Sequence, residues 1–139
     1  MVRKNEDSSD VEGFDTLESS ASARVLISKR ARKEFDGLEV KQRARLGAVL
    51  QRWCQGRALT EEMINTSEGR TSKHKEMVQA FKAFKVRLYG FDRTIKKIKT
   101  FLIVDADPSK KQDKAGPILD RAKKRVDELL DVWVKKEKD

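Results

Sequence analysis

A short apolar run limits the folds open to this chain. Residues 101–104 read Phe-Leu-Ile-Val, and Ala106 follows two positions later. A half-exposed strand alternates apolar and polar residues, so a continuous run of this kind predicts a central strand buried on both faces. The run ends at Asp-Ala-Asp-Pro and passes into a basic loop, whose lysines are Lys110, Lys111 and Lys114.

The surrounding sequence predicts an α+β fold in which helices cover a small sheet. Apolar residues at helical spacing predict a helix after Ser28, which is its expected N-cap, a second helix at residues 40–54 and a third at residues 117–133. Strands are expected at residues 24–28, 77–81, 84–91 and 94–106, and a long connecting loop at residues 57–76. The expected architecture is a small antiparallel twisted sheet with two N-terminal helices and one C-terminal helix.

The predicted strand at residues 84–91 has a basic and aromatic face. Because side chains alternate along a strand, one face should carry Phe84, Val86 and Leu88. The opposite, solvent-facing side should carry Lys85, Arg87 and Tyr89.

Charge divides the chain into three segments. Residues 1–22 are rich in Ser, Asp and Glu and are expected to form a disordered acidic tail. Residues 23–134 should form the folded domain, and residues 135–139 a basic C-terminal tail. The net charge is +9, and the first 23 residues hold only two of the 32 Lys and Arg but six of the 23 Asp and Glu. The body is therefore more basic than the whole, and the acidic tail could fold back over it and weaken polyanion binding.

A body this basic attracts polyanions through long-range electrostatics and counterion release. Nucleic acid is the first candidate partner, an acidic protein the second and an anionic membrane surface the third. Cys54 is the only cysteine, which excludes an intramolecular disulfide. His74 is the only histidine, and one cysteine with one histidine cannot form a zinc site. His74 is expected to be an ordinary loop residue on the surface. The chain lacks a membrane-length apolar run and a signal-peptide pattern, which favours a cytoplasmic protein without a membrane partner.

Three stretches occur in a recognisable order. An opening strand is followed by two helices, the second carrying KQRARLGAVLQRW. A strand pair follows as AFKAFKVRLYGF, and then a last strand, a Lys-Lys loop and a helix as FLIVDADPSKKQDKAGPILDRAKKRVDEL. Over residues 22–130 the chain resembles the RelE/HigB superfamily of bacterial toxins, especially its phage-derived branch.

This resemblance implies the toxin of a type II toxin–antitoxin system. Members of the superfamily are mRNA interferases, endoribonucleases that inhibit translation by cutting mRNA, often on the ribosome. A cognate antitoxin holds them inactive. They use no metal or other cofactor. In their reaction a ribose 2′-OH attacks the adjacent phosphate. The implied partners are therefore mRNA, on the ribosome, and an antitoxin protein.

The resemblance also implies which residues form the site. Arg87 matches the strand arginine of the family, and an arginine can grip two phosphate oxygens and stabilise charge on them. Lys82 matches the preceding basic position, while Lys110 and Lys111 match the loop after the last strand and could act as acid or base. The remaining expected RNA-binding residues are Lys85, Tyr89, Arg70, Lys73 and Lys114, with Tyr89 stacking on a base.

Two features depart from the family pattern. The loop after the last strand reads SKKQDK where HigB-like toxins commonly have Lys-Thr-Pro, and no His or Tyr follows Tyr89 to supply a catalytic group from the final helix. Two alternatives therefore stay open. One is a non-catalytic RNA- or DNA-binding regulatory protein of phage or mobile-element origin on the same fold, and the other is a gyrase-directed toxin.

Overall fold

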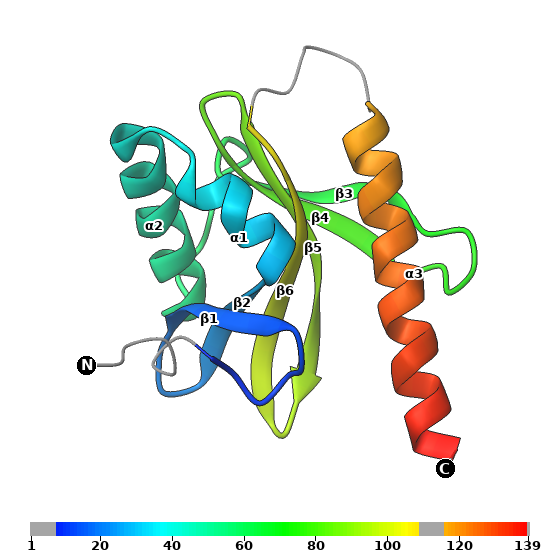
Figure 1. Ribbon diagram of the computed structural model, residues 1–139. Coiled ribbons are helices and arrows are strands. Elements are labelled where there is room, and N and C mark those ends of the chain that lie inside the picture. The colour runs from blue at the N-terminus through cyan, green and yellow to red at the C-terminus, as the bar shows by residue number, and fades with distance from the viewer. Residues whose placement is uncertain (1–7, 109–115, 139) are drawn as a thin grey trace.

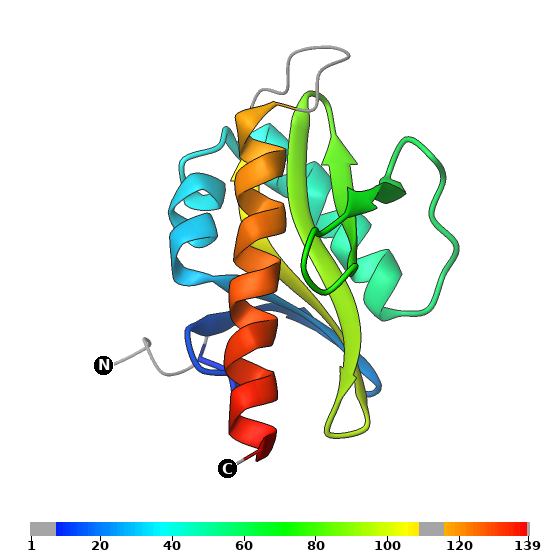
Figure 2. The same ribbon diagram turned by 90° about the vertical axis from the view of Figure 1, so that its right-hand side faces the viewer.

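The structure is a computed structural model that describes residues 8–108 and 116–138. In this part of the chain one sheet has helices α1 (Lys29–Asp36) and α2 (Val40–Cys54) on one face and helix α3 (Pro117–Lys138) on the other (Figure 1). The view turned by 90° shows α3 lying along the sheet (Figure 2). The predicted α+β class is confirmed.

Six strands form one mixed sheet within the described residues. They are β1 (Phe14–Ser19), β2 (Ala23–Ser28), β3 (Ile64–Arg70), β4 (Met77–Ala83), β5 (Val86–Ile95) and β6 (Ile98–Asp107). Their order in the sheet is β1-β2-β6-β5-β4-β3, and neighbours are antiparallel except β2 and β6, which run parallel. The prediction of a purely antiparallel sheet is thus wrong at this one pair. Parallel strands need a long connection, and here α1, α2 and the strands β3 to β5 lie between β2 and β6.

The helix ends follow their sequence signals closely. The side chain of Ser28 accepts a hydrogen bond from the N–H of Ala31 at 3.1 Å, as expected of an N-cap. Gly56 follows α2 with φ +73, a left-handed conformation that favours glycine. Helix α3 runs to Lys138, so most of the predicted basic tail at residues 135–139 is helical. Lysine and glutamate are good helix formers, and they extend the helix past its apolar stripe.

Strand β6 is buried on both faces, as the apolar run predicts. Phe101 and Ile103 pack against α1 and α2, whereas Leu102 and Val104 pack against α3. All four residues are at most 3% exposed. The two cores fix β6 at the centre of the sheet, and they thereby fix the positions of the residues opposite it in β5.

Part of the predicted disordered tail is a strand. Residues 14–19 form β1, an edge strand paired with β2, and Val11 and Phe14 are buried in the core beneath α3. The prediction of disorder for residues 1–22 is therefore wrong for this strand, because its apolar residues find a partner surface that composition does not show. Residues 1–7 lie outside the described part of the chain.

Strand β3 is a second strand that the sequence does not predict, and it lies inside the expected connecting loop at residues 57–76. Strand β3 has the largely polar sequence Ile-Asn-Thr-Ser-Glu-Gly-Arg, and its pairing with β4 is interrupted between Asn65 and Gly69. An edge strand of this composition has no apolar alternation, so periodicity does not reveal it.

Candidate functional site

Two of the predicted cations meet at one end of the sheet. Lys82 in β4 lies directly opposite Arg87 in β5, and directly opposed residues of an antiparallel pair have Cβ atoms about 5 Å apart. Both residues are partly exposed. On the other side of Arg87, the residue opposite it in β6 is Asp107. The sheet therefore brings Lys82 and Arg87 together.

The β4–β5 turn holds the guanidinium of Arg87. Its Nη1 atom donates hydrogen bonds to the carbonyl oxygens of Phe84 at 3.3 Å and of Val86 at 3.0 Å. The other two nitrogens, Nε and Nη2, carry three of the five N–H groups of an arginine. A guanidinium that the described residues hold through one nitrogen can direct the N–H groups of the others at a phosphate.

A pocket of about 360 Å³ opens beside these two cations. It is lined by Arg45 and Val49 of α2, by Glu62 and Met63 of the connection to β3, and by Lys82, Ala83, Phe84 and Arg87 of the β4–β5 hairpin. The carbonyl of Met63 accepts the backbone N–H of Lys82 at 2.8 Å, which ties this connection to β4. The lining combines cations with the carboxylate of Glu62. Such a set of groups can bind a phosphodiester and also accept a proton.

A buried carboxylate anchors α3 near this end of the sheet. The side chain of Asp105 is 2% exposed and accepts hydrogen bonds from Arg121 Nε and Nη2 at 2.8 and 2.7 Å and from Arg125 Nη1 at 3.0 Å. Its contact with Asp105 raises the pKa of Arg121, whereas burial lowers the pKa of Arg125. The residue opposite Asp105 in β5 is Tyr89. The ion cluster thus holds α3 against β6, the strand next to the one that carries Arg87.

Tyr89 lies in the core instead of on the surface. It is 1% exposed and packs beneath α3. Burial, assisted by nearby carboxylates, raises the pKa of its phenol to about 12. The prediction that this side of β5 faces solvent is wrong at Tyr89, because α3 covers it there. A ring so placed is not available to stack on a base.

Of the other lysines predicted to bind or cleave RNA near the turn, only Lys85 lies within the described residues. Lys85 is exposed in the β4–β5 turn, next to Phe84. Lys110, Lys111 and Lys114 lie outside the described residues, so their predicted roles stay predictions.

Arg70 and Lys73 are not brought together with Arg87. Arg70 ends β3 and lies at the opposite end of β4 from Lys82. Lys73 follows in the β3–β4 connection, where its Nζ atom forms an ion pair with Asp131 of α3 at 2.7 Å. Neither residue is placed to share a phosphate with Arg87.

His74 holds the β3–β4 connection against α3. Its Nε2 atom lies 2.8 Å from an oxygen of Asp131, while the backbone N–H groups of Lys73 and His74 donate to Asp127 at 2.8 and 3.1 Å. Burial acts to raise the pKa of Asp127, but hydrogen bonds from Thr71, Lys73 and His74 together lower it. His74 therefore has a structural role in this connection, which its sequence context does not indicate.

Glu62 and Phe84 are among the pocket residues that the sequence patterns do not assign to the site. Glu62 lies in the stretch predicted as a loop, where no motif marks it. The alternation predicts that Phe84 faces the core, whereas it stands in the β4–β5 turn, 51% exposed and with φ +55. The close spacing of the two strand patterns is the signal that could have placed Phe84 in a turn.

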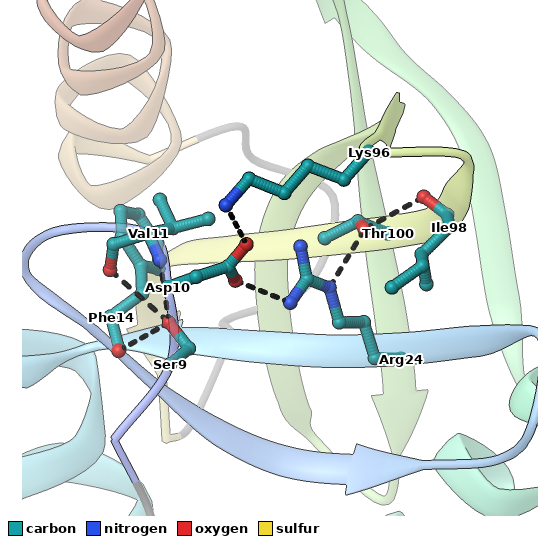
Figure 3. Close-up of polar contacts among 8 residues, drawn as sticks. All are labelled: Ser9, Asp10, Val11, Phe14, Arg24, Lys96, Ile98 and Thr100. Carbon is teal, nitrogen blue, oxygen red and sulfur yellow. Dashed lines mark hydrogen bonds and ion pairs between the residues drawn. The ribbon is translucent and has the colours of Figure 1, made fainter.

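The N-terminal segment is fastened at the other end of β5 (Figure 3). Asp10 forms ion pairs with Arg24 at 2.5 Å and with Lys96 at 3.2 Å, and Arg24 also donates to Thr100 at 3.0 Å. Hydrogen bonding to Arg24 is the main cause of the lowered pKa of Asp10. Lys96 and Arg87 stand at opposite ends of β5, roughly 30 Å apart at the usual rise of a strand. The described part of the acidic segment thus neutralises basic residues of the body without covering Arg87.

None of the described helices is both long and apolar enough to cross a membrane. Among residues 8–108 and 116–138, no three His, Cys, Asp or Glu side chains gather in a way that could hold a metal ion. Comparison of the chain with protein-family models, with curated proteins and with solved structures found no match. A functional assignment therefore depends on the residues and the geometry described above.

Proposed function

We propose that the protein is a RelE/HigB-like toxin, an endoribonuclease that cuts mRNA and is inhibited by a cognate antitoxin. The observation that carries the proposal is the pairing of Lys82 with Arg87 beside a pocket that also contains Arg45 and Glu62. Cations on a strand pair can hold an RNA backbone, and a neighbouring carboxylate can accept a proton from a ribose hydroxyl.

The order of the elements supports the same proposal. The resemblance implies an opening strand, two helices, a strand pair, a last strand and a final helix. Elements β2, α1, α2, β4, β5, β6 and α3 follow one another in this order, with β1 added before β2 and β3 inserted before the strand pair. The basic residues of the strand pair, Lys82 and Arg87, are the ones that the resemblance assigns to the site.

The proposed reaction is the attack of a ribose 2′-OH on the adjacent phosphate. Glu62 takes the proton of the 2′-OH, the bond from 2′-O to phosphorus forms, and the bond from phosphorus to 5′-O breaks. Arg87 stabilises the charge on the phosphate oxygens. Lys82, or Lys110 or Lys111 of the loop after β6, gives a proton to the departing 5′-oxygen. The products are a 2′,3′-cyclic phosphate and a 5′-hydroxyl.

The proposed partners follow from this chemistry and from charge. The substrate is mRNA, on the ribosome, which places the protein in the cytoplasm. The basic body also suits an antitoxin with an acidic surface. The reaction as written involves no metal or organic cofactor.

Induced expression in a bacterial host tests the proposal. We compare the wild type with Arg87→Ala, Glu62→Gln and Arg57→Ala, the last a charge-matched control at an exposed position after α2. Wild type and control should arrest growth and create new mRNA 5′ ends. The two site variants should cut at least about 100-fold less, the usual cost of removing a group that acts in the transition state. Full toxicity and cleavage by Arg87→Ala, with its fold intact by circular dichroism, would contradict the assignment.

A non-catalytic nucleic-acid-binding protein is the second candidate. The two hydrogen bonds of Arg87 to turn carbonyls fit this candidate as well as the first, because they fix the guanidinium on a binding surface. This candidate predicts RNA binding without new mRNA ends. A gyrase-directed toxin would instead arrest growth without cutting mRNA, so the same experiment separates the three functions.

A further inference from the structure

Phe84 occupies an unusual position for a large apolar residue. It stands in the turn between the end of β4 at Ala83 and the start of β5 at Val86. Its side chain is 51% exposed, and its backbone has φ +55. The left-handed region suits glycine and, less well, asparagine or aspartate, and a bulky side chain there is strained.

Cation–π contacts with α2 hold the ring of Phe84, but they require neither a strained backbone nor an exposed position. Glycine would relieve the backbone strain, and a polar residue would suit the exposure. Strained residues tend to persist at sites where the strain is part of the function. Phe84 lies at such a site, since it lines the pocket that contains Lys82 and Arg87.

Cations and hollows surround the ring of Phe84. Lys41 Nζ and Arg45 Cζ of α2 each lie 5.6 Å from its centroid. The ring lines the 360 Å³ pocket and also a second hollow of about 280 Å³, whose other lining residues are Glu39, Lys41, Gln42, Lys85 and Pro108. An exposed aromatic ring thus separates two hollows, each with a cation near the ring.

We propose that Phe84 is a stacking platform for an unpaired RNA base. The base lies on the ring, and the flanking phosphates contact Arg45, Lys82 and Arg87 in the larger hollow and Lys41 in the smaller one. This inference rests on the proposed RNA-cleaving function and adds to it a residue that binds a base of the substrate. The bases of an RNA duplex are already stacked on one another, so the platform selects single-stranded RNA. Because every base has a π-face, it tolerates different sequences.

The test measures RNA affinity apart from cleavage. The probe is a fluorescein-labelled single-stranded RNA with 2′-O-methyl riboses, which cannot undergo 2′-OH attack, and fluorescence anisotropy reports its binding. Phe84→Leu should weaken binding by about tenfold or more, as expected for the loss of one base–aromatic stack. Phe84→Trp should bind within about threefold of the wild type. Val132→Ser, which alters an apolar residue of α3 that is 49% exposed, should leave affinity unchanged.

Two further arms separate stacking from folding and from charge. Phe84→Gly relieves the strained backbone, so it should melt no lower than the wild type and still lose affinity like Phe84→Leu. Against an abasic oligomer of the same backbone, Phe84→Leu and the wild type should bind equally, because that oligomer has no base to stack.

Each contrary result has its own meaning. Equal affinity of wild type and Phe84→Leu for the base-bearing probe would overturn the stacking inference alone. The same would follow if Phe84→Leu lost as much affinity for the abasic oligomer as for the base-bearing probe. Displacement of the probe by polyglutamate at equal charge concentration would assign the surface to an acidic protein. Failure of the wild type to bind any single-stranded RNA would overturn the proposed function and the inference with it.

Discussion

Tyr89 is the only tyrosine of the chain, so its ionisation can be followed without mutation. It is 1% exposed beneath α3. Burial raises the pKa of its phenol from 10.0 to about 12, Glu68 and Asp107 act in the same direction, and Arg87 acts against them. The pKa therefore reports both the burial of the ring and the charges around the candidate site.

We expect tyrosinate absorbance in the folded protein to appear with a midpoint near pH 12, against about pH 10 for the chain unfolded in urea. This difference corresponds to about 3 kcal/mol. The folded-state pKa lies above the unfolded one, so this contribution to stability is complete below pH 10 and is lost as the pH rises from 10 to 12. Burial likewise raises the pKa of Cys54 from 9.0 to about 11, so the loss of stability begins near pH 9. Cys54→Ala should remove the part of the stability loss that begins near pH 9.

Circular dichroism recorded along the titration separates burial from unfolding. Tyrosinate should appear either near pH 12 or together with the loss of the native signal. Arg87→Ala should raise the midpoint, and Asp107→Asn should lower it, because these charges act on the phenol in opposite directions. A midpoint near pH 10 in a protein with an intact native signal would refute the burial of Tyr89 and the packing of α3 over β5.

Two other predictions concern stability and are measured by urea unfolding. Gly90→Ala should cost about 3 kcal/mol or more, because its Cβ would overlap the carbonyl oxygen of Leu102 and approach a ring carbon of Phe101 at 2.8 Å. The matched change Gly47→Ala should stabilise by about 1 kcal/mol, since it lies in α2 with nothing within 4 Å of the added Cβ. Equal effects of the two alanines would contradict the register of β5 and β6. Asp105→Asn should cost about 2–4 kcal/mol by leaving two arginines without their shared carboxylate. A loss below about 1 kcal/mol would show that this cluster does not hold α3.

Local sequence patterns predict the central elements because the position of each element in the fold determines both its pattern and its burial. The apolar run at residues 101–104 is buried on both faces because it is the middle strand of a covered sheet. Ser28 caps α1 and Gly56 follows α2 because those positions impose backbone requirements that few residues meet. Predictions of this kind need no knowledge of distant contacts.

The errors occur where distant contacts decide the outcome. From Val86 to Tyr89 the alternation separates the two faces of β5 correctly. It cannot show that Phe84 and Lys85 stand in a turn, or that α3 covers the face at Tyr89. Residues 14–19 are acidic and yet form β1, because β2 offers a free edge. The candidate site shows the same limit. Arg87 lies in a predicted strand and the family resemblance assigns Lys82, whereas Glu62 joins them only because the connection after α2 packs beside β4.

The chemistry of the cut ends tests the proposed function most directly. RNA from cells expressing the wild type, Arg87→Ala or Arg57→Ala is mapped for new ends, and the terminal groups are identified by selective ligation. Attack by the 2′-OH predicts 5′-hydroxyl ends that match upstream fragments with 2′,3′-cyclic phosphates. These ends should be abundant in the wild type and in Arg57→Ala and nearly absent in Arg87→Ala. New ends carrying 5′-phosphates, or 5′-hydroxyl ends that persist undiminished in a folded Arg87→Ala, would contradict cleavage by this site.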